Sequence, residues 1–243
     1  MKNVLILGAG SDVGQSLARL FASKSYSIHI AGRDMELLES FKKDLEIRYS
    51  VAVNFSYFDA DDFSNHDSFL KNLNQTPDIA IYVIGYMGQK KPMDTDWEDT
   101  LRIVSANYLG AVSIFNRLAK AMKNRKSGIL IGISSVAGER GRQSNYLYGS
   151  AKAGFSTYLS GLRNALISHG VRVITVKPGF INTSMTENLK LPPLLTAQPD
   201  EVALAIYKSI QSGKDILYVR FFWRTIMWII RNIPEKIFKK LSL

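Results

Sequence analysis

Short continuous runs of apolar residues alternate with longer segments in which apolar positions recur with a helical period. Continuous runs are typical of strands buried on both faces of a parallel sheet. The recurrence every three or four positions is typical of helices that pack on one face. The pattern predicts a Rossmann-like, doubly wound α/β fold, with a parallel sheet of about seven strands and helices on both faces. The expected strands are residues 4–7, 27–31, 51–57, 79–84, 129–133, 171–176 and 216–219.

The segments between these strands predict helices that complete one domain. The 243 residues are enough to bury a large core, and no low-complexity linker or internal repeat divides them. We expect residues 1–219 to form a dinucleotide-binding and catalytic domain, with 220–243 as a basic, aromatic C-terminal tail of the same domain. The expected helices are the QSLARLFASK segment and residues 36–48, 97–122, 147–168 and 201–211.

Three glycines follow the first expected strand, in the segment GAGSDVG. A glycine turn between strand and helix lets the backbone approach a pyrophosphate, whose charge the helix start stabilises. An ordinary tight turn is the alternative. Because an acid beside a pyrophosphate is unfavourable, we expect Asp12 to cap the helix. The residues expected at the cofactor are Gly8, Gly10, Ser11, Asp12, Val13 and Gly14.

The residue after the second strand bears on the choice of coenzyme. An acid there would bind a ribose 2′-hydroxyl, whereas an arginine suits a 2′-phosphate. Arg33 therefore favours NADP over NAD, unless it is only a solvated surface charge. Asp34 is expected to be the N-cap of the next helix. Asp59 follows the third strand and either meets an adenine amino group or belongs to a helix-capping turn.

Residues 134–152, SSVAGERGRQSNYLYGSAK, contain a serine pair, a tyrosine and a lysine. Tyr148 and Lys152 are four residues apart and share one face of the expected helix. A lysine ammonium near a phenol favours phenolate, so we expect a lowered pKa for Tyr148 and acid–base chemistry near neutral pH. An aromatic residue on an ordinary helix is the alternative for Tyr148 taken alone.

Two further segments contain candidate site residues. Asn107 lies inside an expected helix, where asparagine is unfavourable. Either its side chain has a functional role, or the residue is tolerated at a polar surface position. Pro178 and Gly179 force a chain reversal at the sheet edge where open α/β sheets bind ligands. Residues 182–199 follow, and we expect them to form a flexible segment long enough to cover a substrate.

Composition and charge narrow the classes of function. The chain has no cysteine and three scattered histidines, so neither disulfides nor a metal site are expected. Residues 220–243 hold six Lys/Arg and one acid, which is half of the net charge of +10. No basic stripe with interleaved aromatics precedes this tail, which argues against nucleic acid as a partner. The apolar start is too short for a secretory signal, so we expect a cytoplasmic protein.

In conjunction, these motifs resemble the short-chain dehydrogenase/reductase family over residues 3 to about 220. The resemblance implies a nicotinamide-dependent enzyme that reduces a carbonyl to an alcohol, and Arg33 favours NADP as its coenzyme. It implies that Ser135 holds the carbonyl and that Tyr148 donates the proton. Lys152 would bind the nicotinamide ribose and lower the tyrosine pKa, and Asn107 would hold a proton-relay water.

The resemblance also assigns cofactor contacts after the fourth and sixth strands. Where the family has Asn-Asn-Ala-Gly, the present chain keeps only Gly85, so contacts to the adenosine ribose there must differ. Ser134 is implied to be a structural neighbour of the catalytic serine. The residues implied on the nicotinamide and carboxamide side are Pro178, Gly179, Ile181 and Thr183.

One branch of the family is similar at the points where this chain departs from the common pattern. It comprises the decaprenylphosphoryl-2-keto-erythro-pentofuranose reductases of bacterial cell-envelope biosynthesis. The likeness rests on GAGSDVG, SSVAGER and the terminal NIPEKIFKK, and it implies a lipid-linked keto-sugar substrate. Glu139, Arg140 and Arg142 are then candidates for contacting a phosphate or sugar.

Three classes of function remain open. They are a membrane-associated reductase of a polyprenyl-phosphate keto-sugar, a soluble short-chain enzyme for another carbonyl or alcohol, and a non-catalytic dinucleotide-binding sensor. Residues 220–243 suit peripheral contact with anionic headgroups at the cytoplasmic membrane face. They do not suit a membrane span, because arginines interrupt them. Packing on the chain's own core, or on the second subunit of an expected homo-oligomer, is the alternative.

Overall fold

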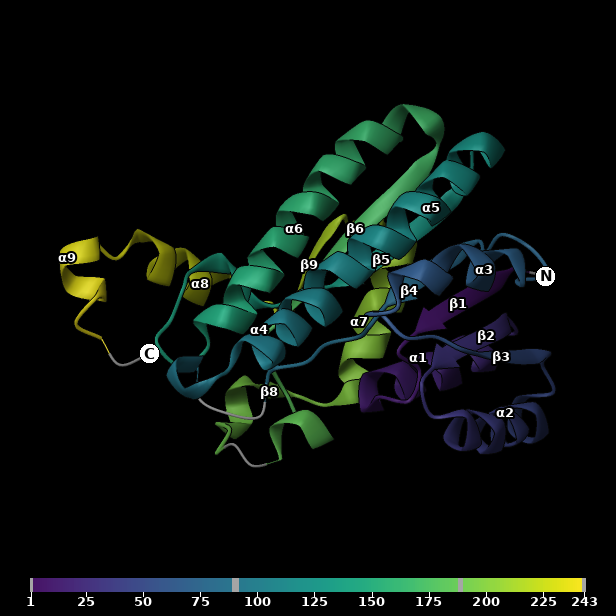
Figure 1. The fold of residues 1–243 in the computed structure, drawn as a ribbon, viewed down its shortest axis with the longest axis horizontal. Helices are drawn as coiled ribbons and strands as arrows, with labels where there is room; N and C mark the ends of the chain where they lie inside the picture. The colour runs from purple at the N-terminus through teal and green to yellow at the C-terminus, as the bar shows by residue number, and fades with distance from the viewer. Residues whose placement is uncertain (1, 89–91, 188–189, 242–243) are drawn as a thin grey trace.

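The computed structural model describes residues 2–88, 92–187 and 190–241 and contains a seven-stranded parallel sheet (Figure 1). The strand order is β3-β2-β1-β4-β5-β6-β9. This arrangement confirms the predicted doubly wound fold. The strands are β1 (Asn3–Leu7), β2 (Ser27–Gly32), β3 (Val53–Tyr57), β4 (Ile79–Tyr82), β5 (Gly128–Ile133), β6 (Val171–Pro178) and β9 (Ile216–Val219).

Helices cover both faces of the sheet. α1, α2 and α7 lie on one face, and α3, α5 and α6 lie on the other, with α4 beside α6 (Figure 1). The helices are α1 (Asp12–Ser23), α2 (Met35–Tyr49), α3 (His66–Lys71), α4 (Trp97–Val104), α5 (Gly110–Arg125), α6 (Tyr146–Leu166), α7 (Pro199–Ser212), α8 (Trp223–Asn232) and α9 (Glu235–Phe238).

Side-chain alternation along the central strands fills two cores at once. In β1, Val4 and Ile6 point into the core under α1 and α7, whereas Leu5 and Leu7 point into the core under α5 and α6. All four are at most 1% exposed. Burial on both faces is therefore the physical reason for the continuous apolar runs in the sequence.

The predicted 97–122 helix is interrupted in the structure. A π-helical turn, Ser105–Leu109, joins α4 to α5 and contains Asn107. The turn keeps the chain helical, so the apolar period continues through it. π turns of this kind are frequent at functional sites.

Residues 182–199, here called the covering segment, contain regular pieces that the sequence pattern did not predict. β8 (Thr196–Ala197) pairs in parallel with β7 (Phe180–Ile181), which directly follows β6. Short 3₁₀ turns lie at Ser184–Thr186 and Pro193–Leu195. The pairing holds the end of this segment beside the carboxyl end of β6.

The C-terminal residues pack against the chain's own body along one side of α8. Trp223 and Met227 are buried in a small cluster with Val136, at 4% and 0% exposure. The Arg140 guanidinium donates to the carbonyl oxygens of Ile230 and Ile233 at 2.7 and 2.6 Å. The packing alternative for residues 220–243 therefore holds for this side of α8. No helix among the described residues is long and apolar enough to span a membrane.

The strand order fixes where a ligand site lies. β1 and β4 are neighbours, and the chain winds away from them in opposite directions, which makes their carboxyl ends a topological switch point. The loops that follow β1, β4, β5 and β6 all leave from this same edge, because the strands are parallel. The glycine turn, Gly85, the serine pair and Gly179 therefore meet there.

Candidate active site

The serine pair follows the last residue of β5, and its two members have different surroundings. The Ser134 hydroxyl donates to the Lys152 carbonyl oxygen at 2.9 Å and lies 2.8 Å from the Ser156 hydroxyl, which agrees with a structural position. Ser135 begins a 3₁₀ turn, Val136–Glu139, and its hydroxyl accepts from the Ala137 N–H at 3.1 Å. Of the two serines, only Ser135 affects the pKa of the Tyr148 phenol, which its hydroxyl lowers.

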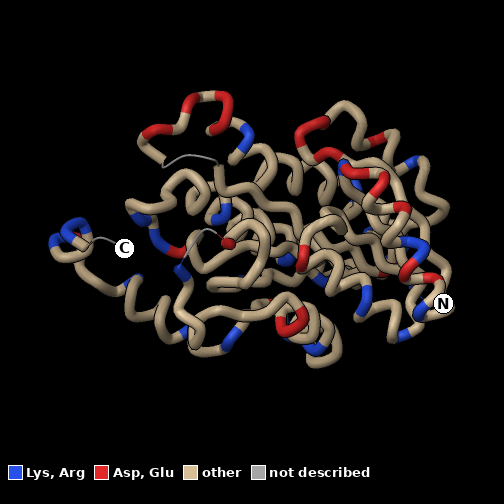
Figure 2. The backbone as a smooth tube through the Cα atoms, turned by 90° about the horizontal axis from the view of Figure 1, so that it is seen from below, with Lys and Arg blue, Asp and Glu red and all other residues tan. Residues whose placement is uncertain are grey.

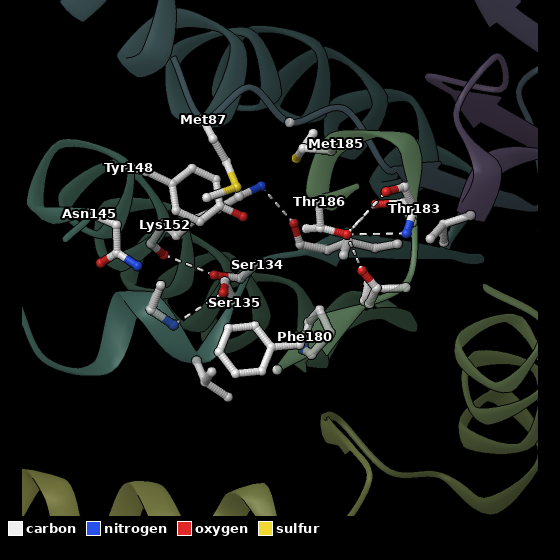
Figure 3. A pocket seen from close by; sticks show the side chains of 18 of the residues that line it. Met87, Ser134, Ser135, Asn145, Tyr148, Lys152, Phe180, Thr183, Met185 and Thr186 are labelled. Atoms are coloured by element: carbon white, nitrogen blue, oxygen red, sulfur yellow. Dashed lines mark hydrogen bonds between the residues drawn. The ribbon is translucent and has the colours of Figure 1, made fainter. Parts of the chain in front are cut away.

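Tyr148 and Lys152 lie in the first two turns of α6, on the side that faces the serines (Figure 3). Lys152 is 2% exposed, and its Nζ donates to the Ile133 carbonyl oxygen at 3.0 Å. The same Nζ lies 5.6 Å from the centre of the Tyr148 ring. The helix spacing thus places the ammonium and the phenol together, as predicted.

Burial controls the protonation of this pair. It lowers the pKa of Lys152 to about 7, because the charged ammonium loses its hydration. It raises the pKa of Tyr148 to about 12, and the hydrogen bond from Ser135 opposes that rise. The expected lowering of the Tyr148 pKa by Lys152 is therefore wrong for this structure. A lysine with a pKa near 7 is only half charged at neutral pH, and burial of the phenol outweighs its effect.

Asn107 lies fully buried in the π turn, next to the lysine. Its Nδ2 donates to the carbonyl oxygens of Tyr86 and Ile103 at 2.6 and 2.8 Å, and its Oδ1 accepts from the Tyr86 N–H at 3.3 Å. A Cβ placed on Gly85 would lie 3.3 Å from Asn107 Oδ1 and 3.6 Å from Lys152 Nζ. The glycine therefore keeps open the space between these two groups.

The turn after β1 has the geometry expected for a phosphate site. Gly8 has a φ of +97°, and a Cβ on Gly14 would lie 2.5 Å from the Gly8 carbonyl oxygen. Both positions therefore need glycine. Ser11 is the N-cap of α1, and its hydroxyl accepts from the Gly14 N–H at 3.1 Å.

The predicted capping role of Asp12 is wrong, because Ser11 caps the helix. The Asp12 carboxylate instead accepts from the Ser184 N–H at 2.9 Å and from its hydroxyl at 3.0 Å. Ser184 belongs to the covering segment, so Asp12 joins that segment to the start of α1. The carboxylate therefore bonds a residue 172 positions away along the chain.

A cavity of about 450 Å³ contains the tyrosine, the lysine and Ser135 (Figure 3). Most of its remaining wall is apolar and includes Met87, Phe180, Met185, Leu191 and Trp223. The residues predicted to contact the cofactor that also line it are Ser11, Asp12, Val13 and Gly85, together with Pro178, Gly179, Ile181 and Thr183 of the predicted nicotinamide side.

A second cavity of about 360 Å³ adjoins the first and shares Ser11, Val83, Gly85 and Met185 with it. Gly8 and Gly10 line it too, beside Arg33 and Asp59. Asp59 Oδ1 accepts from the Asp61 N–H at 3.1 Å, which agrees with the turn alternative, although the residue also faces the cavity. Asp34 accepts from the Leu37 N–H at 3.0 Å and is the predicted N-cap of α2.

The residues present fit a nicotinamide dinucleotide. The two cavities share lining residues, and the segment from Gly8 to Val13 contributes to the walls of both. Side chains at Gly8 or Gly14 would collide with the surrounding backbone or with Ile84. Such a cradle suits a pyrophosphate held by backbone N–H groups at a helix start.

Three residues of the site carry no motif in the sequence. Trp223 comes from α8, and a Cβ on Gly179 would lie 2.0 Å from its indole. Arg102 lines the second cavity, with its guanidinium 4.5 Å from the centre of the Tyr86 ring. Met185 borders both cavities. The sequence of residues 220–243 has an amphipathic pattern, but it does not indicate which residues its apolar face packs against.

The charged run Glu139, Arg140 and Arg142 divides into three separate roles. The Arg140 guanidinium donates to carbonyl oxygens of the C-terminal residues, and its Nη2 lies 2.9 Å from Glu235 Oε2. The expected contact between Arg140 and the substrate is therefore wrong. Glu139 accepts from Lys177 Nζ at 2.8 Å, in a half-buried ion pair. Of the three side chains, only Arg142 lines the catalytic cavity.

Comparison with known proteins agrees with this geometry. The family model for short chain dehydrogenases matches residues 2–193. An uncharacterized oxidoreductase of Mycobacterium tuberculosis is 33% identical over 241 residues, which are 98% of this chain and 96% of the relative. One from Streptomyces coelicolor is 30% identical over 243 residues, 99% and 96% of the two chains. The chain belongs to the short-chain dehydrogenase/reductase family of NAD(P)-dependent oxidoreductases.

Solved structures share the fold at lower identity. A short-chain dehydrogenase from Sphingobium yanoikuyae in complex with NADPH has a TM-score of 0.84 at 20% identity, over 97% of each chain. A 7beta-hydroxysteroid dehydrogenase has a TM-score of 0.87 at 19% identity, over 99% and 96%. A 3-oxoacyl-[acyl-carrier protein] reductase with bound NAD from Brucella melitensis has a TM-score of 0.81 at 21% identity, over 90% and 89%. These likenesses show the fold.

Proposed function

We propose that the protein reduces a carbonyl to an alcohol with NADPH. The observation that carries the proposal is one cavity that holds the Ser135 hydroxyl, the Tyr148 phenol and the buried Lys152 beside the glycine turn. These groups are the ones needed to hold a carbonyl oxygen and to protonate it. The first and second cavities together provide room for the coenzyme.

In this proposal, Ser135 and Tyr148 hydrogen bond to the substrate carbonyl oxygen. The coenzyme, when bound, supplies the hydride that adds to the carbonyl carbon, and the Tyr148 proton passes to the oxygen. Because burial raises the pKa of Tyr148 to about 12, the phenol is protonated at neutral pH and suited to act as a donor. Lys152 would hold the nicotinamide ribose, and Asn107, next to it, would position the water that returns the proton.

The experiment is the substitution Tyr148→Phe, assayed with NADPH and the apolar dicarbonyl 9,10-phenanthrenequinone. General acid catalysis contributes about 10²–10⁴-fold, so turnover should fall by at least about a hundredfold while NADPH binding persists. Tyr158→Phe is the matched control, because that phenol lies on the same helix and bonds Asn116 instead. Normal turnover by Tyr148→Phe with bound NADPH would remove the proposed proton donor. Absence of turnover in both the wild type and the variant, with NADPH bound, would favour the non-catalytic alternative.

The preference for NADP rests on Arg33 at the second cavity, with Arg102 as a further cation there. Similar folds hold NADPH in one structure and NAD in another, so the family alone does not fix the choice. Arg33→Ser should weaken NADPH binding about tenfold or more and leave NADH binding unchanged, because a charge-assisted bond to the 2′-phosphate is lost. Equal affinities of the wild type for the two coenzymes would exclude this role.

For the substrate, we propose a lipid-linked keto-sugar of the polyprenyl-phosphate type. The sequence likeness in SSVAGER and the apolar cavity wall support it. An uncharged, water-soluble ketone turned over at a much higher kcat/KM than any amphiphilic ketone would favour the soluble alternative. The uncharacterized relatives carry no substrate assignment in their names.

Peripheral membrane contact through 220–243 belongs to the same proposal. Phe221, which precedes α8, is 84% exposed, and Trp228 and Ile229 within α8 are 67% and 54% exposed. Lys and Arg outnumber the acids by six to one in this segment, which lies at the left of Figure 2. Such a surface suits an interface with anionic headgroups.

Flotation with phosphatidylserine liposomes tests this contact on the full chain. Replacing Phe221, Trp228 and Ile229 by serine should abolish flotation, whereas serine at the exposed Ile47 should not. Flotation that survives the triple substitution would argue against the surface.

A homo-oligomer is also expected, and exposed Trp97 on α4 offers an apolar contact for it. Sedimentation analysis of Trp97→Ser would test that surface.

A further inference from the structure

Arg142 is a cation in the wall of the catalytic cavity whose hydrogen bonds are largely unmade. It lies between the 3₁₀ turn Val136–Glu139 and α6, and it lines the same cavity as Tyr148. Among the described residues, its Nε is buried without a partner and its Nη2 meets only the Met227 sulfur, at 3.1 Å. A guanidinium has five N–H donors, and a thioether is a weak acceptor.

The acids around Arg142 are engaged elsewhere. Glu139, which faces it, accepts from Lys177 Nζ and from the Tyr218 hydroxyl. Asp12, the acid that lines the same cavity, accepts twice from Ser184. Among the described residues, no carboxylate lies within ion-pair distance of the Arg142 guanidinium. The described acids therefore form no ion pair with this guanidinium.

The surroundings of Arg142 combine this charge with apolar surface. Phe180 and Trp223 line the cavity, with their ring centres 5.6 Å apart in an edge contact. Asn145, from the same loop, also lines the cavity, and its Oδ1 is buried with no partner in the part of the chain that the structure describes. Buried polar groups of this kind are normally satisfied, so two in one wall point to groups supplied by a ligand.

We propose that Arg142 binds an anionic oxygen group of the substrate, a phosphate or a carboxylate, and that the apolar part of the same molecule packs along Phe180 and Trp223. The Asn145 amide accepts from a hydroxyl near the carbonyl. The inference deepens the proposed function, because it takes the catalytic cavity as the substrate site. It defines the substrate as an anionic amphiphile, a class that includes a lipid-linked sugar phosphate.

Isothermal titration of the NADPH-saturated protein tests the proposal without turnover. Decyl phosphate, decanoate and decanol serve as probes below their micelle-forming concentrations. The wild type should bind an anionic probe at least about tenfold more tightly than decanol, because a charge-assisted hydrogen bond contributes roughly that much or more. The decyl phosphate and decanoate titrations distinguish phosphate from carboxylate. Decanol bound as tightly as both anions would overturn the proposal.

Two variants locate the effect. Arg142→Gln should lose the preference for the anion while decanol affinity stays within about twofold, and Arg142→Lys should keep part of it. Arg19→Gln, at an exposed position on α1, is the control. An anion preference unchanged in Arg142→Gln would assign the binding to another cation and overturn the proposal. If Arg142→Gln does not fold, the proposal is tested by comparing the affinities for the anionic probes and for decanol in the wild type and in Arg142→Lys.

The outcome is separable from that of the proposed function. Tyr148→Phe should bind decyl phosphate like the wild type, because the phenol does not meet the anion. If Tyr148→Phe keeps normal turnover while Arg142→Gln loses anion binding, the reduction mechanism fails and the anion site stands. If Tyr148→Phe is inactive and Arg142→Gln is unchanged, the mechanism stands and the anion site fails.

Discussion

Lys152 should destabilise the folded protein at low pH, and its replacement by methionine should reveal by how much. The unfolded chain keeps this lysine protonated up to about its ordinary pKa of 10.5, whereas burial lowers the pKa in the folded protein to about 7. Between these values the unfolded state binds more protons, so wild-type stability rises with pH through that window. Below pH 7, folding must bury the ammonium.

The magnitude follows from the two pKa values. At about 1.36 kcal/mol per pH unit, the difference between 10.5 and about 7 corresponds to roughly 5 kcal/mol. Methionine removes that penalty but also loses the 3.0 Å bond from Nζ to the Ile133 carbonyl oxygen, which contributes about 1 kcal/mol. Lys152→Met should therefore be more stable than wild type by roughly 4 kcal/mol at pH 6.

Urea unfolding at pH 6, 7, 8 and 9, without coenzyme, measures the effect. The advantage of Lys152→Met should shrink by about 1.4 kcal/mol per pH unit above pH 7. Lys208→Met, at an exposed position on α7, should show no such dependence. A stability difference that stays constant across this range, or a destabilised variant at pH 6, would refute the reasoning. Turnover by Lys152→Met should be lost at every pH.

Two further substitutions test the contacts that bound the cavity. Gly179→Ala places a Cβ 2.0 Å from the Trp223 indole, so overpacking should cost about 1–3 kcal/mol of folding stability and lower the Tm by roughly 3–10 °C. The control Gly161→Ala has open space around it and should not lower the Tm. Equal Tm changes for both variants in calorimetry would contradict the contact between Gly179 and Trp223. Asp12→Ala removes both hydrogen bonds to Ser184. The covering segment should lose roughly 1 kcal/mol of local stability, so trypsin should cleave it about fivefold faster. An unchanged cleavage rate would show that these hydrogen bonds do not hold the segment in place.

Much of this site was predictable because its signals are local. The apolar runs marked the strands, and strand order then brings the glycine turn and the serine pair to one sheet edge. The spacing of Tyr148 and Lys152 placed the ammonium beside the phenol. In each case the distance along the chain determines the geometry in space.

The predictions that failed depend on groups distant in sequence or on burial. Asp12 finds its partner in Ser184, 172 residues away, so its acidic character alone suggested a cap. The spacing of Tyr148 and Lys152 shows that two groups meet, but not how much water they lose, and burial sets the direction of both pKa changes. The π turn around Asn107 keeps a helical period and therefore leaves no break in the pattern.

The position of Trp223 indicates that the catalytic residues and one wall of the substrate cavity come from different parts of the chain. The family model matches residues 2–193, which contain the serine, tyrosine and lysine, whereas the indole that closes the cavity over Gly179 comes from beyond that region. Relatives that share the matched region but differ in their last 25 or so residues would keep the reaction and admit other molecules. A chimaera that exchanges only the residues after β9 between two such relatives would exchange their substrate ranges. Substrates should therefore be inferred from relatives chosen by their C-terminal residues.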